Sequence, residues 1–170
     1  MVRYADPGVV EWVESSGGPL VVIPESALPS WLGADSDEHR ADYESACEVD
    51  DWIGLISVGQ EFGLVLGGEP ASTAFLPQHG LFVRWCAAES EAEFLEGVGA
   101  AIEVAVWEPE LLWDVSGPVV LPDAVWSGSE FEGEDHVRVA LEPGRYAVCA
   151  AYVEPNPLTS LVLVQLRSLP

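Results

Sequence analysis

The sequence predicts an α+β fold, mostly antiparallel β, in one domain of two related β-rich halves with one main helix near residues 91–102. Runs of β-branched and aromatic residues, bounded by proline, glycine and acidic residues, recur along the chain and predict about eight strands. Only one segment has a strong helical spacing of apolar residues. The chain has 170 residues, of which 49% are hydrophobic and seven are tryptophan. This length and composition predict one folded core.

Two segments far apart in the chain share a pattern. Residues 16–25 and residues 116–123 both place Gly-Pro before a β-branched run, and both follow a tryptophan, Trp12 or Trp113. Each leads through an acidic stretch to a pair of runs that predicts a hairpin, at residues 52–66 and at 136–149. This predicts an internal duplication of 12–88 and 113–170, with the helix 90–102 between them. The alternative is convergence, because Gly-Pro is a common way to begin a strand.

The remaining elements are predicted from composition and spacing. Further strands are expected at residues 81–86, 103–107 and 158–167. Ser90 and Glu93 form a capping box at the start of the main helix, whose apolar residues Phe94, Leu95, Val98, Ala101 and Ile102 share one face. A short helix within residues 37–47 is expected to turn Tyr43, Ala46 and Cys47 inward.

The charge of the chain is strongly negative. Twenty-nine acidic residues stand against six arginines and no lysine, which gives a formal net charge of -23. Such a field speeds the approach of a basic partner and repels nucleic acid and anionic membranes. Codon bias explains the missing lysines but not the added carboxylates, for which solubility and adaptation to high salt are the alternatives. With no leader-like start and no apolar run of roughly eighteen residues, we expect a cytoplasmic protein.

The motifs that identify common enzymes are missing. His39, His79 and His136 lie in unrelated contexts, and no metal-ligand pair, phosphate loop or nucleophile elbow is found. The cysteines are far apart among apolar neighbours, which predicts reduced core thiols at Cys47, Cys86 and Cys149. We therefore expect no catalysis, no cofactor and no metal site. The alternative is a small-ligand-binding or hydrolytic β-rich enzyme with a carboxylate-lined pocket, built from Asp42, Asp50 and Asp51 or from the histidines.

Two acidic clusters precede the two predicted hairpins. If a pseudo-twofold axis relates the halves, these clusters form one acidic surface, with tryptophans such as Trp31, Trp52 or Trp126 as aromatic anchors or as core residues. A protein interface is the function this combination favours. The candidate binding residues are Asp35, Asp37, Glu38, Asp42, Glu44, Asp50, Asp51, Trp52, Trp126, Glu130, Glu132, Glu134 and Asp135.

The chain resembles a known family through several short stretches. They are Trp12 to Leu20 with Pro24-Glu25-Ser26, Asp42-Tyr43 with Ala46-Cys47 and Val49-Asp50-Asp51, Leu66-Gly67 with Glu69-Pro70 and Ser72-Thr73, and Leu81-Phe82-Val83-Arg84-Trp85. They resemble the immunity protein family numbered twenty-one of bacterial polymorphic toxin systems, over most of the first hundred residues. The resemblance implies a mostly-β protein, encoded beside a toxin, that binds and neutralises its cognate toxin domain without catalysis.

Charge and resemblance together predict the partner. We expect a basic toxin domain whose nuclease-like active site is covered by the acidic surface in place of phosphates. No nucleic acid and no membrane is expected as a partner. The protein itself is expected to be a monomer or a weak dimer.

Overall fold

A computed structural model describes residues 8–34 and 42–170 of the chain. These residues form ten strands, two α-helices and two short 3-10 helices. In chain order they are β1 (Leu20–Pro24), η1 (Glu25–Ser30), α1 (Asp42–Cys47), β2 (Ile53–Val58), β3 (Glu61–Leu66), β4 (Ser72–Leu76), β5 (Leu81–Ala87), α2 (Glu91–Val104), β6 (Leu111–Val115), β7 (Val119–Pro122), η2 (Phe131–Gly133), β8 (His136–Val139), β9 (Gly144–Asn156) and β10 (Thr159–Ser168). The α+β fold class, mostly antiparallel β, is confirmed.

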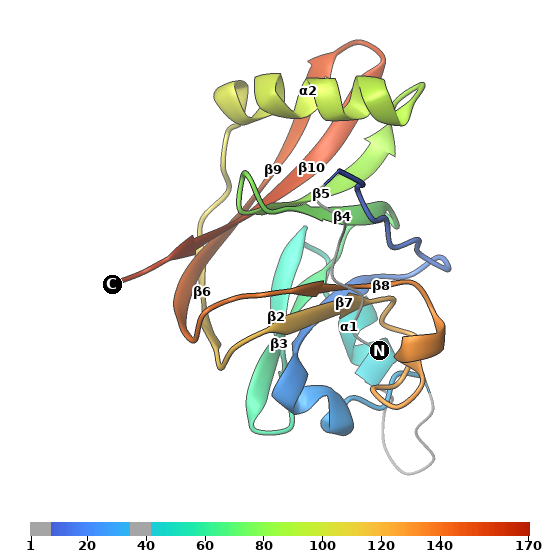
Figure 1. Ribbon diagram of the computed structural model, residues 1–170, viewed down its shortest axis with the longest axis vertical. Coiled ribbons are helices and arrows are strands. Elements are labelled where there is room, and N and C mark those ends of the chain that lie inside the picture. The colour runs from blue at the N-terminus through green and yellow to red at the C-terminus, as the bar shows by residue number, and fades with distance from the viewer. Residues whose placement is uncertain (1–7, 35–41) are drawn as a thin grey trace.

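The strands form two five-stranded antiparallel sheets. We call them the β1 sheet, in the order β2-β3-β1-β7-β8, and the β10 sheet, in the order β4-β5-β10-β9-β6. The two sheets pack face to face, because one apolar cluster draws residues from both, such as Leu20 and Leu121 from the first and Phe82 and Val162 from the second. Figure 1 shows the β10 sheet above the β1 sheet.

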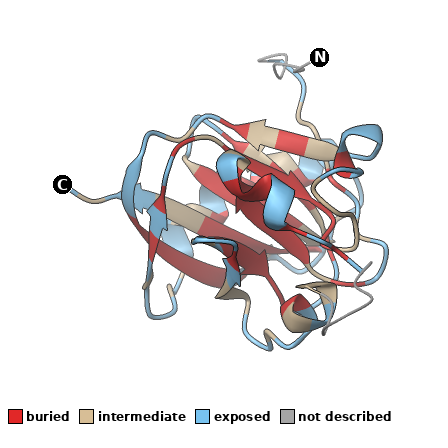
Figure 2. Cartoon of the chain, turned by 90° about the horizontal axis from the view of Figure 1, so that it is seen from below, coloured by how far each residue is buried: buried red, intermediate tan, exposed pale blue. Residues whose placement is uncertain are grey.

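Both outer faces of the sandwich are covered as well. Helix α2 lies across the outer face of the β10 sheet, and α1 with the two 3-10 helices covers the outer face of the β1 sheet (Figure 1). A strand that is buried on both faces needs apolar residues at successive positions, not at alternate ones. This explains the run Leu20–Pro24, in which every residue is buried. Buried positions accordingly run along whole strands in Figure 2.

Helix α2 forms where the capping box predicts it. The Ser90 hydroxyl accepts a hydrogen bond from the Glu93 backbone N–H at 3.1 Å. Phe94 is fully buried and packs edge-on against Trp12, with ring centroids 5.3 Å apart. No helix in the described part of the chain is long and apolar enough to cross a bilayer.

Two predictions about local structure were wrong. Residues 103–107 form no strand, because α2 continues to Val104 and the chain then runs on as an extended connection to β6. Residues 136–149 form no hairpin, because β8 pairs with β7 in one sheet and β9 pairs with β6 and β10 in the other. The chain crosses between the sheets at residues 140–143, where the Tyr146 hydroxyl donates to the Glu142 carbonyl at 2.8 Å. The crossing buries both Val139 and Tyr146 between the sheets.

The strand pairings of the two halves repeat. In the first half β3 pairs with β1, β5 pairs with β4, and Val13 bridges to Thr73 of β4. In the second half β8 pairs with β7, β10 with β9, and β6 with β9. The halves meet at β1–β7 in one sheet and at β5–β10 in the other, both antiparallel. Segments 16–25 and 116–123 therefore lie side by side, which supports the internal duplication as a proposal.

Candidate functional site

Both acidic stretches lead into the same end of the β1 sheet. Leu66 at the end of β3 pairs with Ile53 of β2 and with Leu20 of β1. Leu20 also bridges to Asp123, which follows β7, and Pro122 pairs with His136 at the start of β8. The strands β2 and β8 thus begin at one end of the sheet, at its two edges. We call this region, with the candidate acids that lead into both strands, the acidic end.

The first acidic stretch is fixed by helix α1. The Asp42 carboxylate accepts a hydrogen bond from the Leu32 backbone N–H at 2.8 Å, and the Tyr43 N–H donates to the Gly33 carbonyl at 3.0 Å. Ala46 is fully buried against the outer face of the β1 sheet. Burial raises the pKa of the Tyr43 hydroxyl, and the neighbouring Cys47 and Asp123 raise it further. The exposed positions of this stretch include Glu44, Asp50 and Asp51.

The segment before the second acidic stretch is bonded to the segment before the first. The Ala34 N–H donates to the Val125 carbonyl at 3.0 Å, and the Gly128 N–H donates to the Trp31 carbonyl at 2.8 Å. A Cβ at Gly128 would lie within 1.8 Å of the Leu28 carbonyl oxygen, so only glycine permits this close approach. Phe131 of η2 is buried in the same apolar cluster as Ala46 of α1, and Trp31 lies between the two segments as a core residue. The acids of both stretches are therefore presented on one side of the β1 sheet.

A buried carboxylate joins the segments at this end. Asp123 is 3% exposed. Its two oxygens accept hydrogen bonds from the Ser16 N–H at 2.7 Å and the Val125 N–H at 3.0 Å. It was not among the predicted site residues, and it holds the start of one repeated segment against the end of the other. Nothing in the sequence around Asp123 distinguishes it from the exposed acids.

The predicted site residues fall into three groups. Asp35, Asp37 and Glu38 lie outside the described residues. Asp42 and Trp52 are half-buried, as is Trp126, which packs on the apolar cluster under the acidic end. The others are exposed and belong to the acidic end, and they are Glu44, Asp50, Asp51, Glu130, Glu132, Glu134 and Asp135.

An aromatic pair lies beside Asp50 and Asp51. Trp52 stacks on Tyr152 of β9, with ring centroids 5.9 Å apart and an interplanar angle of 7°. The Tyr152 hydroxyl donates to the Glu154 carboxylate at 2.9 Å, and Tyr152 is 45% exposed. Tyr152 was not predicted as a site residue. Side chains alternate between the two faces of a strand, so Tyr152 lies on the same face of β9 as Tyr146, which faces the β1 sheet. The stack extends the acidic end with an exposed aromatic surface.

The arginines of the described residues are engaged elsewhere. Arg138, Arg145 and Arg167 form ion pairs with Glu25, Asp114 and Glu110. Arg84 is 1% exposed between the sheets and donates to the carbonyls of Gly67 and Glu69. Burial lowers the pKa of Arg84 to about 10. The carboxylates in these three pairs are not members of the acidic end.

The cysteines differ from their prediction. Cys149 is buried, but Cys86 is half-buried and Cys47 is exposed, so the expectation of three core thiols was wrong. Cys47 lies at the end of the short helix α1, where Ala46 faces the sheet and the next residue necessarily points away. Burial raises the pKa of the Cys86 and Cys149 thiols. Residues 8–34 and 42–170 contain no cluster of three or more His, Cys, Asp or Glu side chains that could hold a metal ion.

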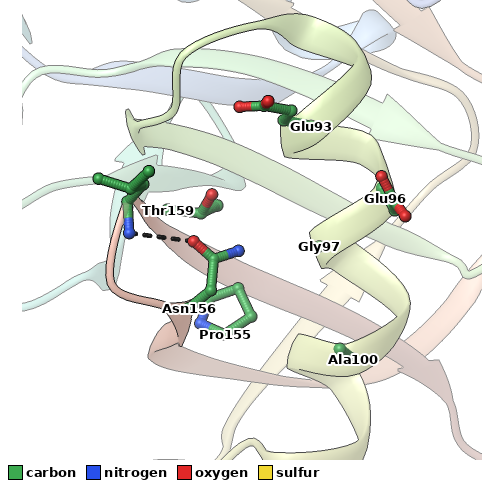
Figure 3. A pocket seen from close by; sticks show the side chains of 8 residues that line it. Glu93, Glu96, Gly97, Ala100, Pro155, Asn156 and Thr159 are labelled. Carbon is green, nitrogen blue, oxygen red and sulfur yellow. Dashed lines mark hydrogen bonds between the residues drawn. The ribbon is translucent and has the colours of Figure 1, made fainter.

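Two surface grooves stand out in the described part of the chain. The larger, of about 470 Å³, lies between α2 and the β9–β10 turn, and Figure 3 shows Glu93 and Glu96 on its helical side and Asn156 on the turn. The smaller is lined by Glu25, Ser26 and residues 116–118. Neither groove includes Asp42, Asp50, Asp51 or a histidine.

Comparison with known proteins gives one match. The family model described as Immunity protein 21 matches residues 11–159, which is most of the chain and includes both acidic stretches and every strand before β10. No curated protein and no solved structure matches the chain significantly.

Proposed function

Because the chain belongs to the Immunity protein 21 family, we propose that it binds and neutralises a cognate toxin domain through the acidic end. One observation carries this proposal: backbone hydrogen bonds between residues 31–34 and 125–128 bring two separate acidic stretches to the same end of one sheet. Bringing like charges together in this way lowers the free energy of unfolding, because the charges repel one another. A binding function gives a reason for the arrangement.

The proposed mechanism is occlusion. Carboxylates on a rigid sheet end attract a basic cleft over long distances and then occupy the positions that phosphate groups would take. Such a protein needs no catalytic residue and no cofactor, and it acts as a monomer in the cytoplasm where the toxin is met. A basic toxin with a nuclease-like active site is the partner that this chemistry fits best.

The size of the acidic end suits this role. Strands β2 and β8 are the outer members of the five-stranded β1 sheet. Neighbouring strands lie about 4.8 Å apart, so the acids before β2 and those before β8 are separated by roughly 19 Å. A standard interface buries about 800 Å² on each partner, which corresponds to a patch somewhat wider than this. The half-buried Trp52 and Trp126 add aromatic contacts within the same span.

A charge-reversal variant tests the proposal. Asp50, Asp51, Glu130 and Glu132 are changed to lysine, and binding to the toxin domain encoded by the neighbouring gene is measured by surface plasmon resonance at several salt concentrations. Association of the variant should be at least tenfold slower at low salt, because electrostatic steering acts mainly on the association rate. The difference should shrink as salt shortens the Debye length to about 8 Å and below. Cells expressing the variant should lose protection against the toxin.

The matched control carries the same change in net charge elsewhere. Glu89, Glu96, Glu103 and Glu142 are exposed and lie outside the acidic end. Changing them to lysine should slow association much less. Equal slowing by both variants would mean that only the total charge matters, and no slowing by either would place the toxin contact on another surface.

A further inference from the structure

Strand β2 is an open edge of the β1 sheet. It pairs with β3 on one side, and no other described strand pairs with it on the second side. Its sequence, Ile-Gly-Leu-Ile-Ser-Val, contains no charged residue and no proline. Natural proteins usually protect such edges with charges, prolines or bulges, since an open edge can pair with another chain.

The other sheet edges in the described residues are protected. Strand β4 is bridged by Val13, which exchanges two backbone hydrogen bonds with Thr73, at 2.8 and 3.0 Å. Strand β8 contains His136 and Arg138, and β6 contains Asp114, whose carboxylate pairs with Arg145. Among these four edge strands, only β2 has neither a charged residue nor a bridging segment.

The free backbone groups of β2 can be identified. A two-residue turn, Gly59–Gln60, joins β2 to β3, with Gly59 at a φ of +62° as a type II′ turn requires at its first position. The flanking pair in such a hairpin is hydrogen-bonded, so Val58 bonds to β3. At the other end of the hairpin the Trp52 carbonyl accepts a hydrogen bond from the Gly67 N–H at 3.0 Å, so the even-numbered residue Trp52 also bonds towards β3, as Val58 does. Bonding alternates along a strand, so the N–H and C=O groups of Ile53, Leu55 and Ser57 point outward.

Charge decides which chain fits this edge. Asp50 and Asp51 directly precede β2, and the whole chain carries a net charge of -23. Two copies approaching edge to edge would bring together two chains of this net charge, so self-pairing is opposed. A basic chain is attracted to the same place, and the edge is continuous with the acidic end.

We propose that the edge of β2 receives an extended segment of the basic toxin domain as an added strand, with basic residues of that segment beside Asp50 and Asp51. Main-chain hydrogen bonds to Ile53, Leu55 and Ser57 hold the segment, as in other cases of strand addition. This inference rests on the proposed function and adds the binding mode. The Trp52–Tyr152 stack at the start of β2 offers an aromatic surface to an arginine at the end of the added strand.

A proline substitution tests the binding mode. Ser57 is exposed and its N–H points outward, so Ser57→Pro removes one donor from the open edge without removing a bond to β3. Affinity for the toxin domain should fall about tenfold or more, because one main-chain hydrogen bond is lost and the proline ring obstructs the added strand. Ser57→Ala keeps the N–H and should bind like the parent. Circular dichroism and thermal unfolding check that both variants remain folded.

Amide exchange on the unmodified protein gives an independent test. In the free protein the amides of Ile53, Leu55 and Ser57 should exchange rapidly, while those of Gly54, Ile56 and Val58 are protected. The first three should become protected on binding the toxin domain. Parent binding without this protection, together with an unaffected Ser57→Pro variant, would overturn the added strand while leaving the proposed function intact. If the parent failed to bind at all, the proposed function would fail first.

Self-association through the edge of β2 is the remaining alternative to be tested. The protein should be monomeric by size-exclusion chromatography with light scattering at physiological ionic strength. A dimer in which Ile53, Leu55 and Ser57 are protected without toxin would show that a second copy occupies the edge, and would overturn the proposal.

Discussion

The carboxylate of Asp123 is the buried charge on which the acidic end depends. It bonds to backbone N–H groups of Ser16 and Val125, which lie on different connections of the chain. Hydrogen bonds to a charged acceptor stabilise a fold more than neutral ones do, and a buried N–H that loses its acceptor keeps its full cost of desolvation. Asp123 is therefore a structural acid among acids that face solvent.

Replacing Asp123 should destabilise the protein strongly. Asp123→Ala leaves two backbone N–H groups without an acceptor and should lower the free energy of unfolding by about 3 kcal/mol. Urea denaturation followed by tryptophan fluorescence measures this. Asp135→Ala, at an exposed position in the same acidic stretch, should change it by no more than about 0.5 kcal/mol. Equal effects from the two substitutions would contradict the structural role of Asp123.

Arg84 shows what residue type alone does not reveal. It lies in the predicted strand 81–86, and its side chain points between the sheets together with Phe82. Its partners are carbonyls of Gly67 and Glu69, on the connection from β3 to β4, and the Thr73 hydroxyl at 3.4 Å. A pattern of apolar alternation predicts that a charged residue faces solvent, unless the carbonyls that satisfy it are known. Those carbonyls come together only in the folded chain.

Among the helices and strands, those with a strong local sequence pattern were the ones that could be predicted. The apolar runs that became β1, β2, β3, β5, β7 and β10 were predicted because β-branched residues between turn residues suffice to identify them. Strands β4 and β6 were missed because each mixes polar with apolar positions. They form because neighbouring strands offer them pairing partners. The hairpin expected at 136–149 failed for a related reason, since a Pro-Gly turn does not reveal whether the chain folds back or crosses to another sheet.

The capping box of α2 allows a quantitative prediction about a single helix. Ser90→Ala removes the acceptor of the Glu93 N–H and should lower the free energy of unfolding by about 1 kcal/mol. Ser90→Thr retains a hydroxyl acceptor and should cost only a few tenths of that. Thermal unfolding monitored by circular dichroism compares the two. An Ala variant as stable as the Thr variant would mean that the N-cap adds nothing beyond the packing of Phe94 and Val98.

At the scale of the whole molecule, charge opposes folding. With a net charge of -23 the compact state repels itself, and added salt screens that repulsion. The unfolding temperature should therefore rise by several degrees between about 10 mM and 500 mM sodium chloride, the reverse of a protein stabilised by surface ion pairs. Differential scanning calorimetry measures the change. An unfolding temperature that is constant or falls with salt would show that ion pairs such as Arg145–Asp114 outweigh the repulsion.

The acidic end could be predicted only in part. The sequence identifies the two clusters, and the repeated Gly-Pro segments predict that they are related. The connection between the two acidic stretches depends on the close approach of Gly128 to Leu28 and on the hydrogen bonds of Asp123. The spacing of residues in the sequence reveals neither of these contacts. The same holds for Trp52 and Tyr152, which are a hundred residues apart and stack because the two sheets bring their ends together.

The junctions between the two halves have a consequence for synthesis. Both sheets are completed by pairing across them, β1 with β7 and β5 with β10, and β10 is the last strand of the chain. A nascent chain that ends before residue 159 leaves β5 paired with β4 alone, so the β10 sheet is incomplete until β10 has been made. Long-range antiparallel pairing also folds slowly compared with local structure. The apolar core between the sheets closes only when β10 has been made, because Val162 and Val164 of that strand belong to it.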